Sequence, residues 1–506
     1  MLSIIVLQLL MIFVIGSPFV SRQIPIPEQV HLSIADQSRS MRVHWVTLEE
    51  VVGENSMVQY GTQSNALDQR ANARTTIFES DGVVRFMHSA DMLNLKPATS
   101  YCKLIQNVNK NLGSLVYRVG SPSAFSRIFE FRSFPDGDFP LRVCIFGDLG
   151  VDNGISLVHL QRAAERDEFD LVIHVGDIGY DLHKENGTVG DSFMRGVEVG
   201  AKICEFKSSF SVNCKPSSIR ENQNFYFRWL LLATMKSTTI SLTTDIDFNF
   251  NQTMLLETRK LTVSILGMFI SWAFQRNTLV FFYEYGKQAV IRQHQWLRND
   301  FAKANANRDK TPWLIVYQHR PFYCSNKNSF ECNSFENTLV RKGFEEMEGL
   351  EDLYLEYNVD IGFAGHEHSY ERLYPIANRR VYNLTRDPYH NSQAPVYVCS
   401  GSAGCHTPHA SFQEETPTPG SACRSVDYGW TMMHVLNKTT IYIEQISIEK
   451  GVKPIDAFWI TKDIGHRHLT KRSNNFYPFP SYETQTFCDM KDPRCKFKRD
   501  NGLLID

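Results

Sequence analysis

The sequence predicts two parts in order along the chain: an all-β sandwich over residues 25–135, then an α/β domain built of β-sheet layers flanked by helices. Short runs of alternating apolar and polar residues, separated by polar turns, indicate the sandwich; residues 41–45 (MRVHW) are one example. From Leu141 onward, continuous apolar strands alternate with segments of helical spacing, which is typical of sheets covered by helices. The 506 residues are enough for two or three domains with a substantial core.

Within the α/β part, apolar runs and helical spacing locate most of the elements. Buried strands are predicted at residues 141–146, 170–175, 313–317 and 359–364. Helices are predicted at residues 155–166, about 292–305 and 344–357. Strands return after Val396 within a C-terminal part at residues 376–465, and residues 466–506 are predicted to form a tail.

The composition limits the classes of function. Hydrophobic residues make up 42% of the chain and charged residues 21%, as in ordinary globular proteins. The formal net charge of −2 argues against a general nucleic-acid binder, because no basic excess is present to neutralise phosphates. A small phosphorylated substrate remains compatible with this charge, since local charges decide its binding.

The N-terminus predicts export through a signal peptide at residues 1–21. Residues 2–15 form an apolar run that is too short for a membrane span and is followed by the small residues Gly16 and Ser17. A buried helix is the alternative interpretation of this run. The 11 cysteines fit an oxidising compartment, and their odd number leaves at least one thiol unpaired.

Export also predicts how the surface is modified and where the protein is found. The sequons at Asn186, Asn383 and Asn437 are expected glycosylation sites. A second apolar stretch, residues 261–274, is again too short for a span, so no membrane partner is expected. We therefore expect a secreted, lysosomal or extracellular protein.

Each of the four predicted buried strands is followed by side chains that can bind a metal ion. These are Asp148 in GDLG, Asp177 and Tyr180 in GDIGY, His319 in YQHRP, and His366 and His368 in GHEH. In α/β sheets ligands bind outside the carboxyl ends of the strands, so we expect these side chains to meet at one edge. Taken singly, each has an ordinary structural explanation: a turn, a helix cap or a hydrogen-bonded histidine. Together they favour a site for two metal ions.

A metal pair predicts phosphoester hydrolysis. A carboxylate can bridge two cations, and neutral imidazoles can fill their remaining positions. Two cations about 3.5–4 Å apart can clamp a phosphoryl group and activate a water molecule as hydroxide. The chain contains no GxSxG motif that would indicate a covalent serine route.

These motifs resemble those of the metallophosphoesterase superfamily, and more closely those of the purple acid phosphatases, particularly the large animal iron/zinc members. The family motifs are GDxG, GDxxY, GNH[DE], a strand ending in histidine, and GHxH. Tyr180 discriminates within the superfamily, because a phenolate ligand to iron(III) makes that family purple. The likeness includes a fibronectin-like or immunoglobulin-like β domain at residues 25–135 and a metallophosphoesterase domain at residues 140–375. It also includes GHEHSYERLYP at residues 365–375 and GSAGC at residues 401–405.

The resemblance implies a role for each candidate ligand and an activity for the chain. Asp148, Asp177, Tyr180 and His368 would hold iron(III), and Asp177 would bridge to zinc or iron(II), which His319 and His366 also hold. The implied activity is that of an acid phosphatase, in which a metal-activated hydroxide attacks a small phosphate monoester. The β domain would then be structural or contribute to a homodimer contact.

One family motif is missing from the chain. GNH[DE], which supplies an asparagine ligand of the divalent ion and a substrate-contacting histidine, should lie between residues 195 and 281, where the sequence contains no histidine. A two-base shift of the reading frame of Leu232 to Lys236 can encode Gly-Asn-His-Glu, and the same shift of residues 227–231 can encode an apolar strand before it. We therefore interpret residues 196–277 as including intron-derived or out-of-frame translation. Residues 103–116 are interpreted as a smaller insertion of the same kind.

Three alternatives to a purple-type phosphatase remain. Another metallophosphoesterase, such as a phosphodiesterase or nucleotidase, is disfavoured by Tyr180 and by the β domain in front. A catalytically impaired metal-binding paralogue is consistent with the missing motif. A glycosylated structural ectodomain would leave the strand-end side chains without an explanation.

Overall fold

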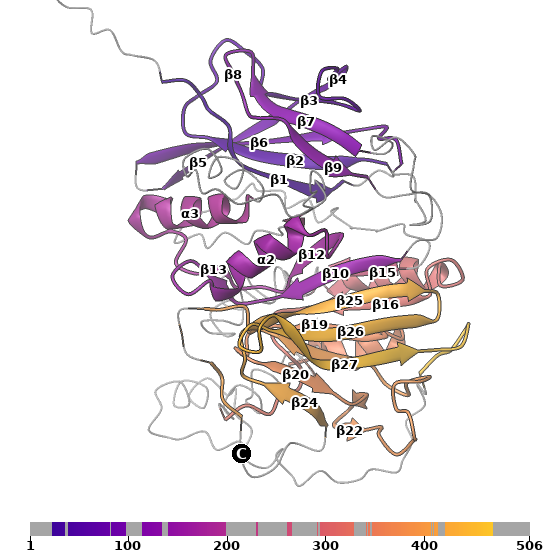
Figure 1. Cartoon of the computed structure of the whole chain (residues 1–506). Coiled ribbons are helices and arrows are strands. Elements are labelled where there is room, and N and C mark those ends of the chain that lie inside the picture. Colours follow the sequence, from indigo (N-terminus) through magenta and orange to yellow (C-terminus); the bar gives the residue numbers. More distant parts are fainter. Residues whose placement is uncertain are drawn as a thin grey trace, which may run out of the picture.

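The computed structural model describes residues 23–35, 39–80, 82–97, 114–133, 140–198, 229–230, 261–265, 291, 294–327, 341, 343–344, 347–405, 407, 409–412 and 420–468 (Figure 1). The predicted signal peptide, most of residues 196–277 and the tail beyond residue 468 lie outside the described residues. The predicted insertion at residues 103–116 also lies outside them, except for residues 114–116, which belong to a strand of the sandwich.

The first part of the chain is an antiparallel β-sandwich, as predicted. One sheet has the order β1-β2-β6-β5, and the other has β4-β3-β7-β8 with β9 paired to β7. The bounds are β1 Glu28–Ile34, β2 Met41–Thr47, β3 Met57–Gly61, β4 Gln69–Asn72, β5 Arg74–Ser80, β6 Val83–Met92, β7 Ser114–Ser121, β8 Ala124–Phe125 and β9 Phe129–Arg132. The alternation in β2 places Met41, Val43 and Trp45 in the core of the sandwich.

The second part contains two six-stranded mixed sheets. The first has the order β14-β12-β10-β25-β26-β27 and the second β15-β16-β19-β23-β20-β24. Strands of the first are β10 Leu141–Phe146, β12 Leu171–His174, β14 Trp229–Leu230, β25 Gly429–Asn437, β26 Thr440–Ser447 and β27 Lys453–Thr461. Strands of the second are β15 Leu261–Ile265, β16 Trp313–Tyr317, β19 Ile361–Ala364, β20 Tyr370–Leu373, β23 Val396–Ser400 and β24 Ser421–Ser425. Each sheet thus has a run of parallel strands followed by antiparallel ones.

The two sheets pack face to face, and helices cover their outer faces. The helical segments are α2 Ile155–Glu165, the 3-10 turn η1 Glu185–Gly187, α3 Thr188–Val197, residues 294–306 and α8 Leu350–Glu356. Ile145 of the first sheet and Ile315 of the second belong to the core between the sheets. Leu160 of α2 packs on the outside of the first sheet, and Leu353 of α8 packs on the outside of the second. Sheet layers flanked by helices are therefore confirmed.

The predicted helix at residues 344–357 is too long at its N-terminal end. A short hairpin, β17 Gly343–Phe344 and β18 Met347–Glu348, precedes α8, which begins only at Leu350. Gly349 caps the helix with extended backbone, and Glu351 and Asp352 in the first turn complement the positive end of the helix dipole. Among the described residues, no helix is long and apolar enough to cross a membrane.

Two short strands lie within residues 196–277. β14 pairs in parallel with β12, and β15 pairs in parallel with β16. The carboxyl end of β14 therefore points to the same sheet edge as the carboxyl ends of β10 and β12.

The sandwich contacts the α/β part through α3. The guanidinium of Arg85 on β6 donates to both carboxylate oxygens of Asp191 on α3, and both side chains are buried. Gln29 donates to the same carboxylate at 2.9 Å, and Arg195 of α3 pairs with Glu28 of β1 at 2.7 Å. One buried ion pair and one partly exposed ion pair thus connect the two parts.

Candidate metal centre

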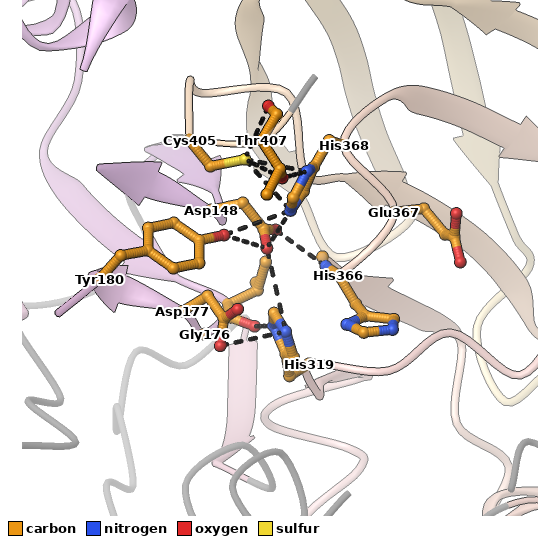
Figure 2. A network of polar contacts seen from close by, with 12 residues as sticks. Asp148, Gly176, Asp177, Tyr180, His319, His366, Glu367, His368, Cys405 and Thr407 are labelled. Carbon is orange, nitrogen blue, oxygen red and sulfur yellow. Dashed lines mark hydrogen bonds and ion pairs between the residues drawn. The ribbon is translucent and has the colours of Figure 1, made fainter. Parts of the chain in front are cut away.

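The six predicted metal-binding side chains come from loops after four strands, two in each sheet. Asp148 follows β10, Asp177 and Tyr180 follow β12, His319 follows β16, and His366 and His368 follow β19. Figure 2 shows Tyr180, His319 and His368 pointing toward Asp148, whereas Glu367 of the same GHEH motif points away. The structure thus brings all six residues together, and metal binding by them stays a prediction.

Asp148 is the centre of the group and is fully buried. Its Oδ1 accepts a hydrogen bond from the Tyr180 hydroxyl at 2.9 Å and lies 3.3 Å from Nε2 of His368. The same oxygen is 3.9 Å from Nε2 of His319. The other oxygen accepts a hydrogen bond from the backbone N–H of His366 at 2.8 Å. One carboxylate therefore contacts loops from both sheets.

His319 and Asp177 form the second half of the site. Ligand atoms of Asp148, Asp177 and His319 all lie within 4.8 Å of one another. Nδ1 of His319 donates to the carbonyl of Val175 at 3.1 Å, since a carbonyl can only accept. This hydrogen bond turns Nε2 toward Asp177, whose Oδ1 is 3.3 Å away. The His366 ring packs edge-on against His319 with a centroid distance of 5.1 Å.

The backbone at four of the six positions is left-handed. φ is +61° at Asp148, +49° at Asp177, +45° at Tyr180 and +71° at His366. Aspartate and histidine tolerate this region better than most residues, whereas a bulky tyrosine is an outlier there. Such strain is concentrated at functional sites, where surrounding contacts hold it in place.

Two glycines allow the loops to approach one another closely. A Cβ at Gly365 would lie 2.6 Å from Oδ2 of Asp148, and a Cβ at Gly176 would lie 2.5 Å from Nδ1 of His319. Gly176 also has a φ of +112°, which L side chains rarely adopt. The glycines of GDIGY and GHEH are therefore needed for close contact as well as for the turns.

Burial and charge act in opposite directions on the titratable groups. Burial disfavours the charged form of Asp148, but His319 and His368 outweigh it and lower the pKa to about 2. Burial likewise opposes protonation of His368, yet hydrogen bonds with Asp148 and Cys405 raise its pKa to about 11. Burial, together with the charges of Asp148 and Asp177, raises the pKa of Tyr180 well above its ordinary value. Ionising this phenol requires a nearby cation.

The donor set fits a metal cofactor. Carboxylates, imidazoles and a phenol provide hard and intermediate ligands of the kind that iron and zinc accept. Nε2 of His319 is buried and, among the described residues, has no hydrogen-bond partner of good geometry. This nitrogen faces the carboxylates of Asp148 and Asp177. A cation bound here would give the imidazole and both carboxylates a partner.

Cys405, the last residue of GSAGC, and Thr407 also contact the site, although no role was predicted for either. Cys405 Sγ and Thr407 Oγ1 each lie 2.9 Å from Nδ1 of His368 (Figure 2). They are more than 35 residues away from His368 in sequence, and no local pattern indicates this contact.

Comparison with family models divides the chain among three matches. Residues 27–133 match the "Purple acid Phosphatase, N-terminal domain" and residues 217–370 match "Calcineurin-like phosphoesterase". Residues 394–457 match "Iron/zinc purple acid phosphatase-like protein C".

Individual relatives agree with these matches. The chain is 36% identical over 460 residues to acid phosphatase type 7 of Homo sapiens, covering 88% of this chain and 92% of the relative. It is 26% identical to purple acid phosphatase 15 of Arabidopsis thaliana, covering 75% of this chain and 68% of the relative. A purple acid phosphatase from yellow lupin (Lupinus luteus) seeds has a similar fold, with a TM-score of 0.60, 17% identity, and coverage of 90% of this chain and 78% of that one.

Proposed function

The chain belongs to the purple acid phosphatase family, and from that premise we propose that it hydrolyses phosphate monoesters at a centre of iron(III) and a divalent ion. One observation carries the proposal: the Tyr180 hydroxyl and Nε2 of His368 both reach the same oxygen of Asp148. A phenol in this position separates a purple-type centre from those of phosphodiesterases and nucleotidases in the same superfamily.

The contacts support a division of ligands between the two ions. Asp148, Asp177, Tyr180 and His368 would hold iron(III), with Asp177 bridging to zinc or iron(II) that His319 and His366 also hold. Asp177 has ligand atoms within 4.8 Å of those of both Asp148, assigned to iron(III), and His319, assigned to the divalent ion, which supports this bridging role. Burial and the charges of Asp148 and Asp177 raise the pKa of Tyr180, so its phenolate would form only beside a strong positive charge such as iron(III) would supply.

When bound, such a metal pair activates water and stabilises negative charge on a phosphoryl group. The chain itself holds the ligands in place: Val175 fixes the tautomer of His319, and the backbone of His366 orients Asp148. The expected substrate is a small phosphate ester.

The asparagine ligand of the divalent ion and the substrate-contacting histidine are the missing parts. We propose that they are encoded in another frame of the segment Leu232 to Lys236. The parallel pairing of β14 with β12 supports this, because the carboxyl end of β14, at Leu230, points to the sheet edge where Asp177 follows β12. The alternative is a metal-binding paralogue that retains the iron(III) ligands but has little turnover.

Sequencing the spliced transcript decides between these two possibilities. We expect a message that encodes Gly-Asn-His-Glu after an apolar strand in this interval. A message that encodes residues 196–277 as written would reject the frame hypothesis and leave the impaired paralogue.

The iron centre is tested by colour and metal content. The frame-corrected protein should bind two metal ions per chain and show a visible tyrosinate–iron absorption band. Tyr180→Phe should abolish the band, whereas Tyr442→Phe, which changes a tyrosine on β26 that contacts Glu444, should keep it. A colourless parent protein without two bound metals would contradict the proposal.

We also propose that the protein is glycosylated and exported to an extracellular or lysosomal compartment. Asn186, Asn383 and Asn437 are all exposed, which supports modification at each sequon. Cys324 is disulfide-bonded, which supports an oxidising compartment. A homodimer stays a prediction.

A further inference from the structure

The ring of His368 is held on both of its nitrogen-bearing sides. Nε2 lies 3.3 Å from Oδ1 of Asp148 and 3.3 Å from the hydroxyl of Tyr180. On the other side, Thr407 Oγ1 lies 2.9 Å from Nδ1. Cys405 Sγ lies 2.9 Å from Nδ1, 3.4 Å from Nε2 and 3.0 Å from Thr407 Oγ1, so the sulfur contacts the ring edge between the two nitrogens and is closer to Nδ1. Two side chains from a different loop thus form a closed triangle with Nδ1.

The loop that carries Cys405 is anchored independently of His368. The backbone N–H of Gly150, in the short strand β11 (Leu149–Gly150), donates to the carbonyl of Gly404 at 2.6 Å. The side-chain amide of Asn153 donates to the carbonyl of Cys405 at 2.6 Å and to the hydroxyl of Tyr428 at 3.1 Å. Cys405 is only 3% exposed. The thiol therefore has a fixed position against which the imidazole can rest.

We propose that Cys405 and Thr407 are positioning residues that hold His368 with Nε2 directed into the metal site. The inference rests on the proposed iron centre. When Nε2 of a neutral imidazole binds a cation, Nδ1 carries the remaining ring hydrogen and requires an acceptor. Thr407 Oγ1 and Cys405 Sγ are acceptors within reach, and the thiol can at the same time donate to the Thr407 carbonyl at 3.3 Å.

Such acceptors orient a ligating histidine and make it more basic, and their loss commonly weakens metal binding about 10-fold to 100-fold. In Cys405→Ala the sulfur is lost, and in Thr407→Val the hydroxyl is replaced by a methyl group of similar size. Cys405→Ser and Thr407→Ser keep a hydrogen-bonding group in each place. The four variants therefore separate hydrogen bonding to Nδ1 from simple packing.

The experiment measures iron(III) affinity of the full-length chain by chelator competition, together with the tyrosinate–iron band. The parent is the same frame-corrected protein as in the colour test, so residues 196–277 as written cannot account for a loss of iron. We expect Cys405→Ala and Thr407→Val to weaken iron binding about 10-fold or more and to shift the band, and we expect both serine variants to stay near the parent. Cys423→Ala, which removes a half-buried thiol on β24, should bind iron as the parent does.

The metal-free melting temperature of each variant shows whether the loop is still folded. An unchanged melting temperature with weakened iron binding supports the positioning role. Equal iron affinity in the parent and in Cys405→Ala and Thr407→Val would overturn it while leaving the iron centre intact, as would serine variants no better than Ala and Val. A parent that binds no iron and has no band would overturn the proposed function, and the positioning role with it.

Discussion

Among single residues, His88 of the sandwich shows how burial can fix a charge state. Its ring is 2% exposed, stacks on Trp45 and contacts the hydroxyls of Thr47 and Thr75 through its two nitrogens. The Thr47 hydroxyl donates to a backbone carbonyl, so it accepts from Nε2–H of His88, while Nδ1 accepts from Thr75. Burial lowers the pKa of His88 from 6.5 to about 4.

This depressed pKa predicts a loss of stability in acid. The contribution is fully present above pH 6.5 and is lost as the pH falls toward 4, because the unfolded chain then binds a proton that the folded chain excludes. In His88→Gln, the free energy of unfolding in urea should therefore fall less between pH 7 and pH 4 than in the parent, by on the order of 3 kcal/mol. The same change at the exposed His390 should leave the parent's pH dependence in place. If the free energy of unfolding of His88→Gln fell with pH as steeply as that of the parent, burial of His88 would not be the cause of the acid sensitivity.

At the scale of elements, Asp360 joins three segments of the second part near the start of β19. Lys462, just after β27, reaches one of its oxygens at 2.6 Å, and Arg308 reaches the other at 2.7 Å. The same carboxylate accepts a hydrogen bond from the backbone of Leu314 in β16. All three charged side chains are nearly fully buried, and although burial alone would raise the pKa of Asp360, the two cations lower it.

Removal of this carboxylate should be costly. Asp360→Ala leaves Lys462 and Arg308 buried without their common partner, so we expect a loss of about 3–5 kcal/mol in the free energy of unfolding. Glu168→Gln is the control, because its pair with Arg166 is exposed and should contribute less than about 1 kcal/mol. Denaturant unfolding measures both variants, and similar values for the two would show that the buried cluster adds little.

At the scale of the whole molecule, the contact between the sandwich and α3 includes one buried ion pair, Arg85 with Asp191. Burial alone would raise the pKa of Asp191, but hydrogen bonds from Arg85 and Gln29 lower it. A Cβ at Gly187 would lie 2.9 Å from the Arg85 guanidinium, so the adjoining turn leaves no spare room. This pair is the buried part of the contact between the sandwich and the part that carries the candidate metal centre.

Breaking the pair should loosen the sandwich without unfolding it. Asp191→Ala leaves Arg85 buried and unpaired, and we expect faster proteolysis between the two parts, consistent with a loss of about 3 kcal/mol at the contact. The double change Arg85→Met with Asp191→Leu should restore much of the protection, since apolar groups of similar size can replace a buried pair. Asp91→Ala, which breaks a half-exposed pair within the sandwich, is the control. Protection unchanged in Asp191→Ala would exclude this role of the pair.

Much of the fold could be predicted from the sequence, as could the approach of the six candidate side chains to one another; metal binding by them stays a prediction. The continuous apolar runs that became β10, β12 and β16 are local patterns, and the rule that ligands gather at the carboxyl ends of strands then placed Asp148 near His319. The hairpin before α8 could not be predicted, because the apolar and acidic residues near Phe344 fit the periodicity of a helix as well as that of a strand. The helix begins only after Gly349.

The sequence by itself therefore determined the sandwich, the order of the buried strands along the chain, and which residue types follow the strand ends. Only the tertiary structure decided that the strands divide between two sheets, that four of the six positions have left-handed backbone, and that Cys405 and Thr407 lie behind His368. The physical reason is the sequence separation of the contacting residues, because periodicity and strand-end motifs are local properties of the chain. Sheet membership and contacts to His368 depend instead on pairings between segments far apart in sequence, which no local pattern specifies.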